Sequence, residues 1–166
     1  CMLEIFFACL VSSTVFIACG YLFNFIFLKK NISNIDFYES TLFGLVLLSF
    51  LSLIINFFIP LNKALGSFLI IISIIFYLYT NIILKHKNLF YLLFISLISF
   101  FLITLSNINR PDAGLYHLPF IGLINSEKII IGSVNINFRF GHISIIQYLS
   151  AIFNNYFFKN EIITLP

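Results

Sequence analysis

The stretch "SFLIIISIIFYLYTNIIL", residues 67–84, decides the fold class of this protein. Twelve of its eighteen residues are Ile, Leu or Phe, and none is charged. Because each of these residues contributes about −0.3 to −0.6 kcal/mol to insertion at the centre of a membrane helix, the stretch as a whole gains roughly 5 kcal/mol. The uncharged window around it, 64–84, is long enough as a helix to cross about 30 Å of hydrocarbon. It predicts a transmembrane helix.

Three further uncharged windows, 5–28, 40–62 and 88–109, have the same character, in a chain of 166 residues that is 61% hydrophobic and 9% charged. A weaker fifth helix is predicted near 142–158, because this region includes His142, Gln147 and two asparagines. The expected fold is therefore all-α, a polytopic transmembrane helix bundle of four to five spans forming a single domain over 1–166. A cleaved signal peptide in the first window is disfavoured, because it lacks a basic start and its apolar run is too long.

The remaining composition excludes other classes of protein. The net charge of +3 is spread along the chain with no basic run, so nucleic acid is not an expected partner. The three cysteines, Cys1, Cys9 and Cys19, show no metal-ligand spacing and are interpreted as small apolar residues. Membrane lipid is the expected partner.

Lysines in the short loops predict the orientation. Lys29 and Lys30 follow the first window and Lys85 and Lys87 follow the third, whereas the loop after the second window contains only Lys63. Basic residues favour the cytoplasmic side. We therefore expect an integral protein of the bacterial inner membrane, with the loop 106–140 on the outer face.

This loop is long for a connection between two spans, which is typical of a functional segment. Its apolar parts, 115–124 and 129–131, are expected to lie along the membrane or to pack on the helices. In "VNINFRF", residues 134–140, apolar and polar side chains alternate. A period of two predicts an extended segment that presents Asn135, Asn137 and Arg139 to an outer cleft.

The charged residues of the loop suggest a chemistry, although each has a simpler interpretation. Asp112 could accept a proton from an attacking hydroxyl, and the Arg139 guanidinium could bind a phosphate with two hydrogen bonds. Alternatively, Asp112 caps a helix, Tyr116 and His117 are interfacial anchors, and Arg139 pairs with Glu127 or with lipid phosphates. Together, a carboxylate, an imidazole and a guanidinium are the groups that an enzyme of lipid-phosphate sugars needs.

"PDAGLYHLPFIGLI" (111–124) and "GSVNINFRFGHISIIQYLSAIF" (132–153) resemble the first large outer loop of a group of bacterial polytopic membrane proteins. That group is similar in architecture to the GT-C glycosyltransferases, which use polyprenyl-phosphate sugars as donors. The resemblance implies a role in cell-envelope polysaccharide or glycolipid assembly, and a chain that is the N-terminal part of a longer protein. It implies that Asp112 is the catalytic residue, which activates the acceptor or holds a divalent metal ion. The implied substrate-binding residues are Tyr116, His117, Asn135, Asn137, Arg139 and His142.

Two other functions remain open. A transporter or flippase-like component would need no covalent chemistry, but transporters usually carry ionisable residues within their spans. The four strongest windows contain none. A non-catalytic membrane scaffold would also explain polar residues at a helix edge.

Overall fold

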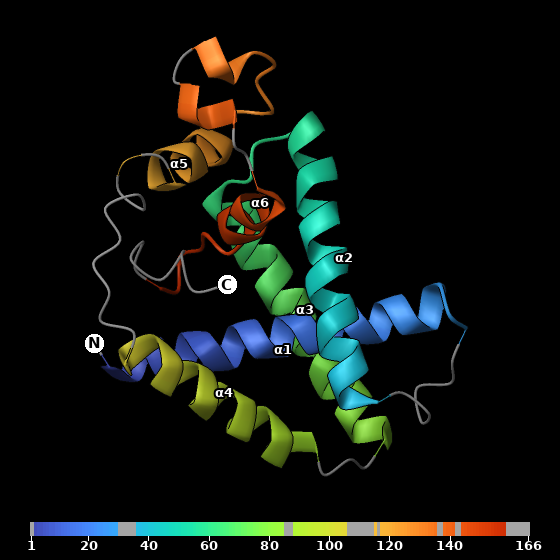
Figure 1. The fold of residues 1–166 in the computed structure, drawn as a ribbon. Helices are drawn as coiled ribbons and strands as arrows, with labels where there is room; N and C mark the ends of the chain where they lie inside the picture. Colours follow the sequence, from blue (N-terminus) through green and yellow to red (C-terminus); the bar gives the residue numbers. More distant parts are fainter. Residues whose placement is uncertain are drawn as a thin grey trace. The chain divides into compact units, whose positions relative to one another are not determined.

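A computed structural model describes residues 2–29, 36–84, 88–105, 115, 117–135, 138–141 and 144–158 of the chain. Within these ranges every regular element is a helix, as the all-α prediction requires. In chain order these elements are α1 (Met2–Ile26), α2 (Phe37–Phe58), α3 (Lys63–Leu84), α4 (Asn88–Leu105), α5 (Leu118–Ser126), the 3₁₀ turns η3 (Ser133–Asn135) and η4 (Phe138–Gly141), and α6 (Ile145–Ile152) (Figure 1).

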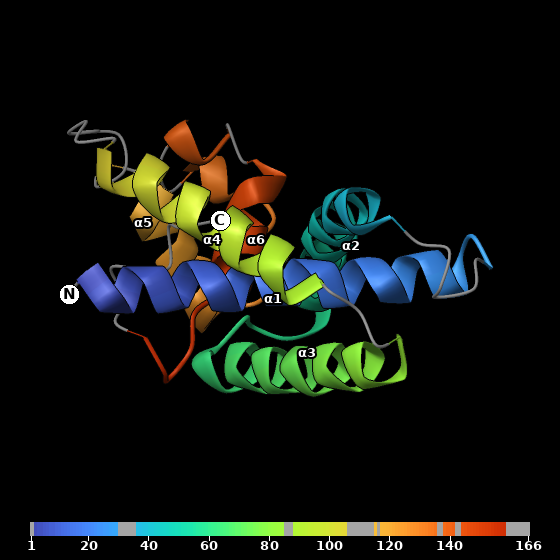
Figure 2. The same ribbon diagram turned by 90° about the horizontal axis from the view of Figure 1, so that it is seen from below.

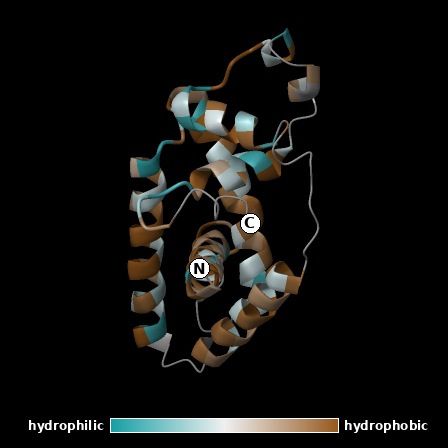
Figure 3. Ribbon diagram, turned by 90° about the vertical axis from the view of Figure 1, so that its left-hand side faces the viewer, coloured by the Kyte–Doolittle hydropathy of each residue, from teal (hydrophilic) through white to brown (hydrophobic). Residues whose placement is uncertain are grey.

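Three helices, α1, α2 and α3, are long and apolar enough to cross a membrane. Most residues of these helices are hydrophobic, and brown, the colour of hydrophobic residues, predominates on the long helices in Figure 3. The apolar part of α4, Leu89–Leu105, is shorter. Within the described part of the chain, three helices therefore have the length and composition of membrane spans, as in an integral membrane protein, and the predicted number of four to five spans is not confirmed.

The fifth helix predicted over 142–158 is much shorter than expected. α6 has only 8 residues, about 12 Å, and cannot cross a membrane. Its start is fixed by Ser144, whose side chain accepts a hydrogen bond from the backbone of Ile146. Beyond its end, the Asn155 side chain accepts hydrogen bonds from the backbone N–H groups of Phe157 and Phe158, both at 2.8 Å. The Ser144 cap therefore fixes where the helix begins, and a separate turn at Asn155 follows its end.

The chain forms two compact units. Unit 1 contains residues 1–48 and 68–106, and unit 2 contains residues 49–67 and 107–164. The end of α2 and the start of α3 thus belong to unit 2 together with α5, η3, η4 and α6.

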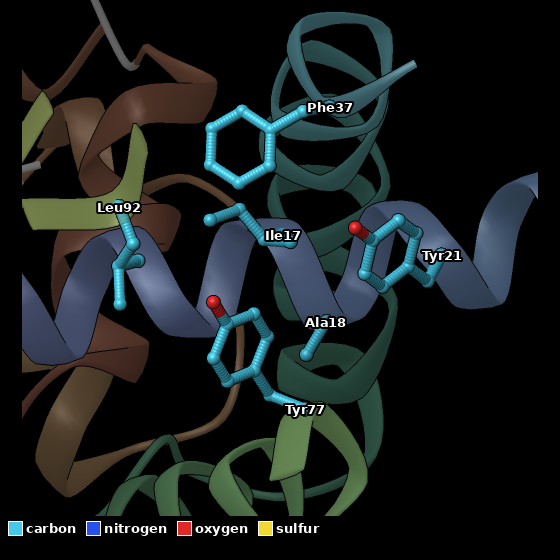
Figure 4. Close-up of a cluster of buried hydrophobic side chains, with 6 residues drawn as sticks. All are labelled: Ile17, Ala18, Tyr21, Phe37, Tyr77 and Leu92. Atoms are coloured by element: carbon cyan, nitrogen blue, oxygen red, sulfur yellow. The ribbon is translucent and has the colours of Figure 1, made fainter. Parts of the chain in front are cut away.

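Unit 1 is organised around α1. Its core contains Ile17, Ala18 and Tyr21 of α1, with Phe37, Tyr77 and Leu92 from the other three helices (Figure 4). α4 lies beside the N-terminal half of α1, as both Figure 1 and Figure 2 show.

Two glycines let α1 and α2 touch at the backbone level. A Cβ on Gly20 would overlap the carbonyl oxygen of Ser40, and a Cβ on Gly44 would overlap that of Phe16. Beside this crossing, the fully buried Asn24 donates hydrogen bonds to the Gly20 carbonyl oxygen at 3.1 Å and to the Ser40 hydroxyl at 3.4 Å. Small residues at a close crossing and an amide bonded across it are typical of packed membrane helices.

Candidate functional site

The candidate site in unit 2 is built around Asn56, which is fully buried in the last turn of α2. Its amide nitrogen lies within hydrogen-bond distance of three carbonyl oxygens, those of Ile59 (3.4 Å), Ile124 (3.3 Å) and Glu127 (3.2 Å). Ile124 and Glu127 belong to the end of α5, where carbonyl groups have no partner within the helix. The amide therefore bonds to carbonyl groups that α5 itself leaves without a helical partner.

Backbone hydrogen bonds complete this connection, which we call the Asn56 clamp. The backbone N–H of Ile129 donates to the Asn56 carbonyl oxygen at 3.0 Å. The backbone N–H of Leu61, between α2 and α3, donates to the Ile124 carbonyl oxygen at 3.1 Å. The clamp thus fixes α5 and the segment after it against the connection between α2 and α3.

Beside the clamp lies a cavity of about 330 Å³. This volume is at the lower end of the range for pockets that bind small molecules. Most of its wall is apolar, and its polar groups come from Asn56, Lys128, Ser133 and Tyr148. The remaining lining residues are Phe57, Phe120, Leu123, Ile124 and Ile129–Gly132.

Three aromatic side chains, those of Phe120, Phe140 and Tyr148, pack together beside the cavity. The Phe120 ring centroid lies 5.3 Å from that of Phe140 and 6.2 Å from that of Tyr148, the latter pair at an edge-to-face angle of 84°. Burial raises the pKa of the Tyr148 hydroxyl above its ordinary value. Tyr148 is therefore held in its neutral form, which suits a hydrogen-bonding role in an apolar wall.

His117 connects the start of α5 to α6. Its Nδ1 atom lies 2.7 Å from Nε2 of Gln147, and the Gln147 Oε1 atom accepts a hydrogen bond from the Ser144 N–H at 3.1 Å. Since Oε1 is committed to Ser144, the amide nitrogen donates to His117. The neutral imidazole must then accept at Nδ1 and carry its proton on Nε2.

A family model matches residues 2–165, almost the whole chain. The chain belongs to the DUF8201 family, described as a domain of unknown function. Neither the comparison with curated proteins nor that with solved structures gives a match.

Of the predicted site residues of the DUF8201 chain, the structure describes two together with their side chains. His117 takes part in the contact between α5 and α6, and Asn135 is exposed at the end of η3. Arg139 lies in η4, but its side chain is outside the described part. Asp112, Tyr116, Asn137 and His142 lie outside the described residues. Among the residues that are described, no three His, Cys, Asp or Glu side chains gather to hold a metal ion.

The prediction of an extended segment over 134–140 is wrong for those of its residues that the structure of the DUF8201 chain describes. Val134 and Asn135 belong to one 3₁₀ turn, and Phe138 to Gly141 form another. Gly132 has a φ of +85°, which favours glycine and turns the chain into η3. Phe140 is buried against Phe120, so tertiary packing overrides the local alternation.

Two sequence features of the DUF8201 chain indicate the buried polar contacts at Asn56 and at the start of α6. A single asparagine near the end of an apolar window, as at Asn56, needs a buried partner. "SIIQ", residues 144–147, has the spacing of a capping box, which predicts the roles of Ser144 and Gln147 at the start of α6.

Proposed function

We propose that the chain acts on lipid-linked sugars at the outer face of a membrane, as a GT-C-like glycosyltransferase component of cell-envelope assembly. The observation that carries this proposal is the cavity of unit 2, which has a mostly apolar wall and includes Lys128 among its lining residues. An isoprenoid chain needs apolar contacts, and its phosphate needs a cation. Both are present on one cavity at the end of a membrane-spanning helix.

The depth of the cavity supports a lipid ligand. Asn56 and Phe57 both line it, and both belong to the last turn of α2. A span of 22 residues is about 33 Å long, so its last turn reaches the edge of the hydrocarbon, where lipid phosphates lie. A phosphate at this level would be within the reach of the exposed Lys128 side chain.

The residues of the outer loop would supply the chemistry. The acceptor hydroxyl oxygen would bond to the anomeric carbon of the donor sugar, the bond from that carbon to the phosphate oxygen would break, and Asp112 would take the hydroxyl proton. Arg139 would bind the leaving polyprenyl phosphate through two hydrogen bonds. Tyr116, His117, Asn135, Asn137 and His142 would contact donor and acceptor. A divalent ion held by Asp112 would act in the same place, and no step here depends on one.

Binding is tested first, with purified protein in nanodiscs and undecaprenyl phosphate as the probe. Lys128→Gln should weaken binding roughly two- to fivefold, the effect expected from losing an exposed ion pair worth up to about 1 kcal/mol. The matched control is Lys63→Gln, because Lys63 lies in the same unit but does not line the cavity. Equal binding of undecaprenol, which lacks the phosphate, would contradict the proposal, as would an unchanged affinity in Lys128→Gln.

Catalysis is tested separately, by sugar transfer from polyprenyl-phosphate sugars in membranes that contain the natural protein. Asp112→Asn should abolish transfer and leave abundance and lipid binding unchanged, since asparagine can still cap a helix. Arg139→Lys should weaken donor binding, because an ammonium group cannot form the paired contact. Full transfer by Asp112→Asn would overturn the catalytic role, and binding without any transfer would favour a flippase-like or scaffold function.

A further inference from the structure

We propose that the segment after α5 enters the headgroup region of the bilayer and anchors unit 2 there. The residues concerned are Ile131, Val134 and Phe138, which we call the apolar tip. This inference does not depend on sugar transfer, because it concerns only where the segment lies.

The apolar tip exposes large side chains. Ile131 is 96% exposed and Phe138 is 72% exposed, and about half of Val134 is exposed as well. Exposed apolar surface costs about 25 cal/mol per Å² in water. Three such side chains within eight residues are typical of a surface that contacts a membrane or a protein.

Hydrogen bonds fix the depth of the apolar tip. The Ile129 backbone is bonded to Asn56, two residues before α2 ends at Phe58. Ile131 follows two residues later, so it lies within about 7 Å of that bond along the chain. The headgroup region adds roughly 5 to 7 Å on each side of the hydrocarbon. Ile131 is thereby held at the edge of the bilayer.

Neighbouring residues favour lipid as the partner at this level. Phe57 and Phe58, in the last turn of α2, are exposed where that helix would meet lipid. Exposed Glu127 and Lys128 precede the apolar tip and suit the polar headgroups. The apolar tip therefore continues the lipid-facing surface of α2. Since Ile130 to Ser133 also line the cavity, one wall of the cavity would lie against lipid.

The experiment uses a fluorescent NBD label on Ile131→Cys in phosphatidylcholine vesicles. Cys1 is replaced by serine, while Cys9 and Cys19 are buried and react poorly. The label is quenched in turn by iodide, by lipid with a nitroxide near the headgroup, and by lipid with a nitroxide near the chain end. Reference labels at Lys29→Cys, beyond the end of α1, and at Ile75→Cys, exposed in the middle of α3, define the water and deep-lipid limits.

We expect blue-shifted emission at position 131, with the shallow nitroxide quenching more strongly than iodide or the deep nitroxide. Phe138→Cys should behave in the same way, which guards against a local effect of one label. Quenching by iodide alone, as at Lys29, would place the apolar tip in water and overturn the proposal. Protection from all three quenchers would show that protein covers the tip and would equally overturn it.

Discussion

Asn56 is the residue on which unit 2 depends. It lies in an apolar helix, where an amide costs free energy unless it is hydrogen-bonded. Its amide nitrogen and backbone oxygen together contact the backbone of residues more than 60 positions away in the sequence. Through the clamp, this one polar residue of α2 connects the helix to α5 and so positions the cavity.

Replacing Asn56 should therefore loosen unit 2. Asn56→Leu keeps the side-chain size but leaves the Ile124 and Glu127 carbonyls without this donor, which should lower the free energy of unfolding by about 1 to 3 kcal/mol. Chemical denaturation in detergent and proteolysis near α5 would measure the loss. The control is Asn81→Leu, because the Asn81 amide donates to the Tyr77 carbonyl oxygen one turn earlier in its own helix. An equal loss in both variants would contradict the role of the clamp.

Tyr148 should make stability depend on pH in the alkaline range. Burial raises its pKa above the ordinary value of 10.0, so the folded protein favours the neutral phenol. The stability from this group is fully present below about pH 10 and is lost as the pH rises through the pKa of the folded state. Tyr148→Phe should remove that part of the alkaline decline. Melting temperatures at pH 8 to 11 would test this, with Tyr156→Phe as the exposed control.

At the scale of elements, the backbones of α1 and α2 come into direct contact where the two helices cross. Gly20 and Gly44 lie on opposite sides of this contact, and each meets a carbonyl oxygen of the other helix. Within a membrane, lipid is as apolar as a leucine side chain, so close packing rather than hydrophobicity holds helices together. The crossing should then be sensitive to a single methyl group.

Gly20→Ala and Gly44→Ala should each destabilise unit 1, by about 1 to 3 kcal/mol, because the backbones must separate to admit a Cβ. Gly122→Ala in α5 is the control, since nothing lies within 4 Å of its Cβ position. Alanine there should be neutral or stabilising by up to about 1 kcal/mol, through its higher helix propensity. Thermal unfolding in detergent measures all three, and unchanged stability in Gly20→Ala would refute the close contact.

At the scale of the whole molecule, a hydrogen bond within unit 2 predicts whether α4 crosses the membrane. The Leu61 N–H, between α2 and α3, donates to the Ile124 carbonyl oxygen of α5, so we expect α5 and the connection between α2 and α3 to lie on the same side of a membrane. A chain that leaves this side through α3 must return to it before α5. We therefore expect α4 to cross as well, although its 18 residues, about 27 Å, barely match the hydrocarbon.

Labelling with a membrane-impermeant thiol reagent on intact cells would test this topology. Cysteines at positions 30 and 87 should stay unreactive from outside, whereas a cysteine in place of the exposed Ser126 should react. All three should react once the membrane is permeabilised, which controls for burial. Reaction at 126 from the same side as 87 would show that α4 does not cross.

The sequence by itself determined the membrane class and the positions of α1, α2 and α3, because insertion depends on the summed apolar content of one continuous segment. It also identified His117 as a polar residue of interest and, through Ser144 and Gln147, contained the start of α6. Only the tertiary structure decided that residues 133–135 and 138–141 each form a turn, that α6 ends after 8 residues, and that Asn56 lines a cavity. Each of these depends on contacts between residues far apart in the sequence, such as Phe120 with Phe140 and Asn56 with Ile124. A local sequence pattern does not show which distant residues will be in contact, so it cannot predict the free energy of these contacts.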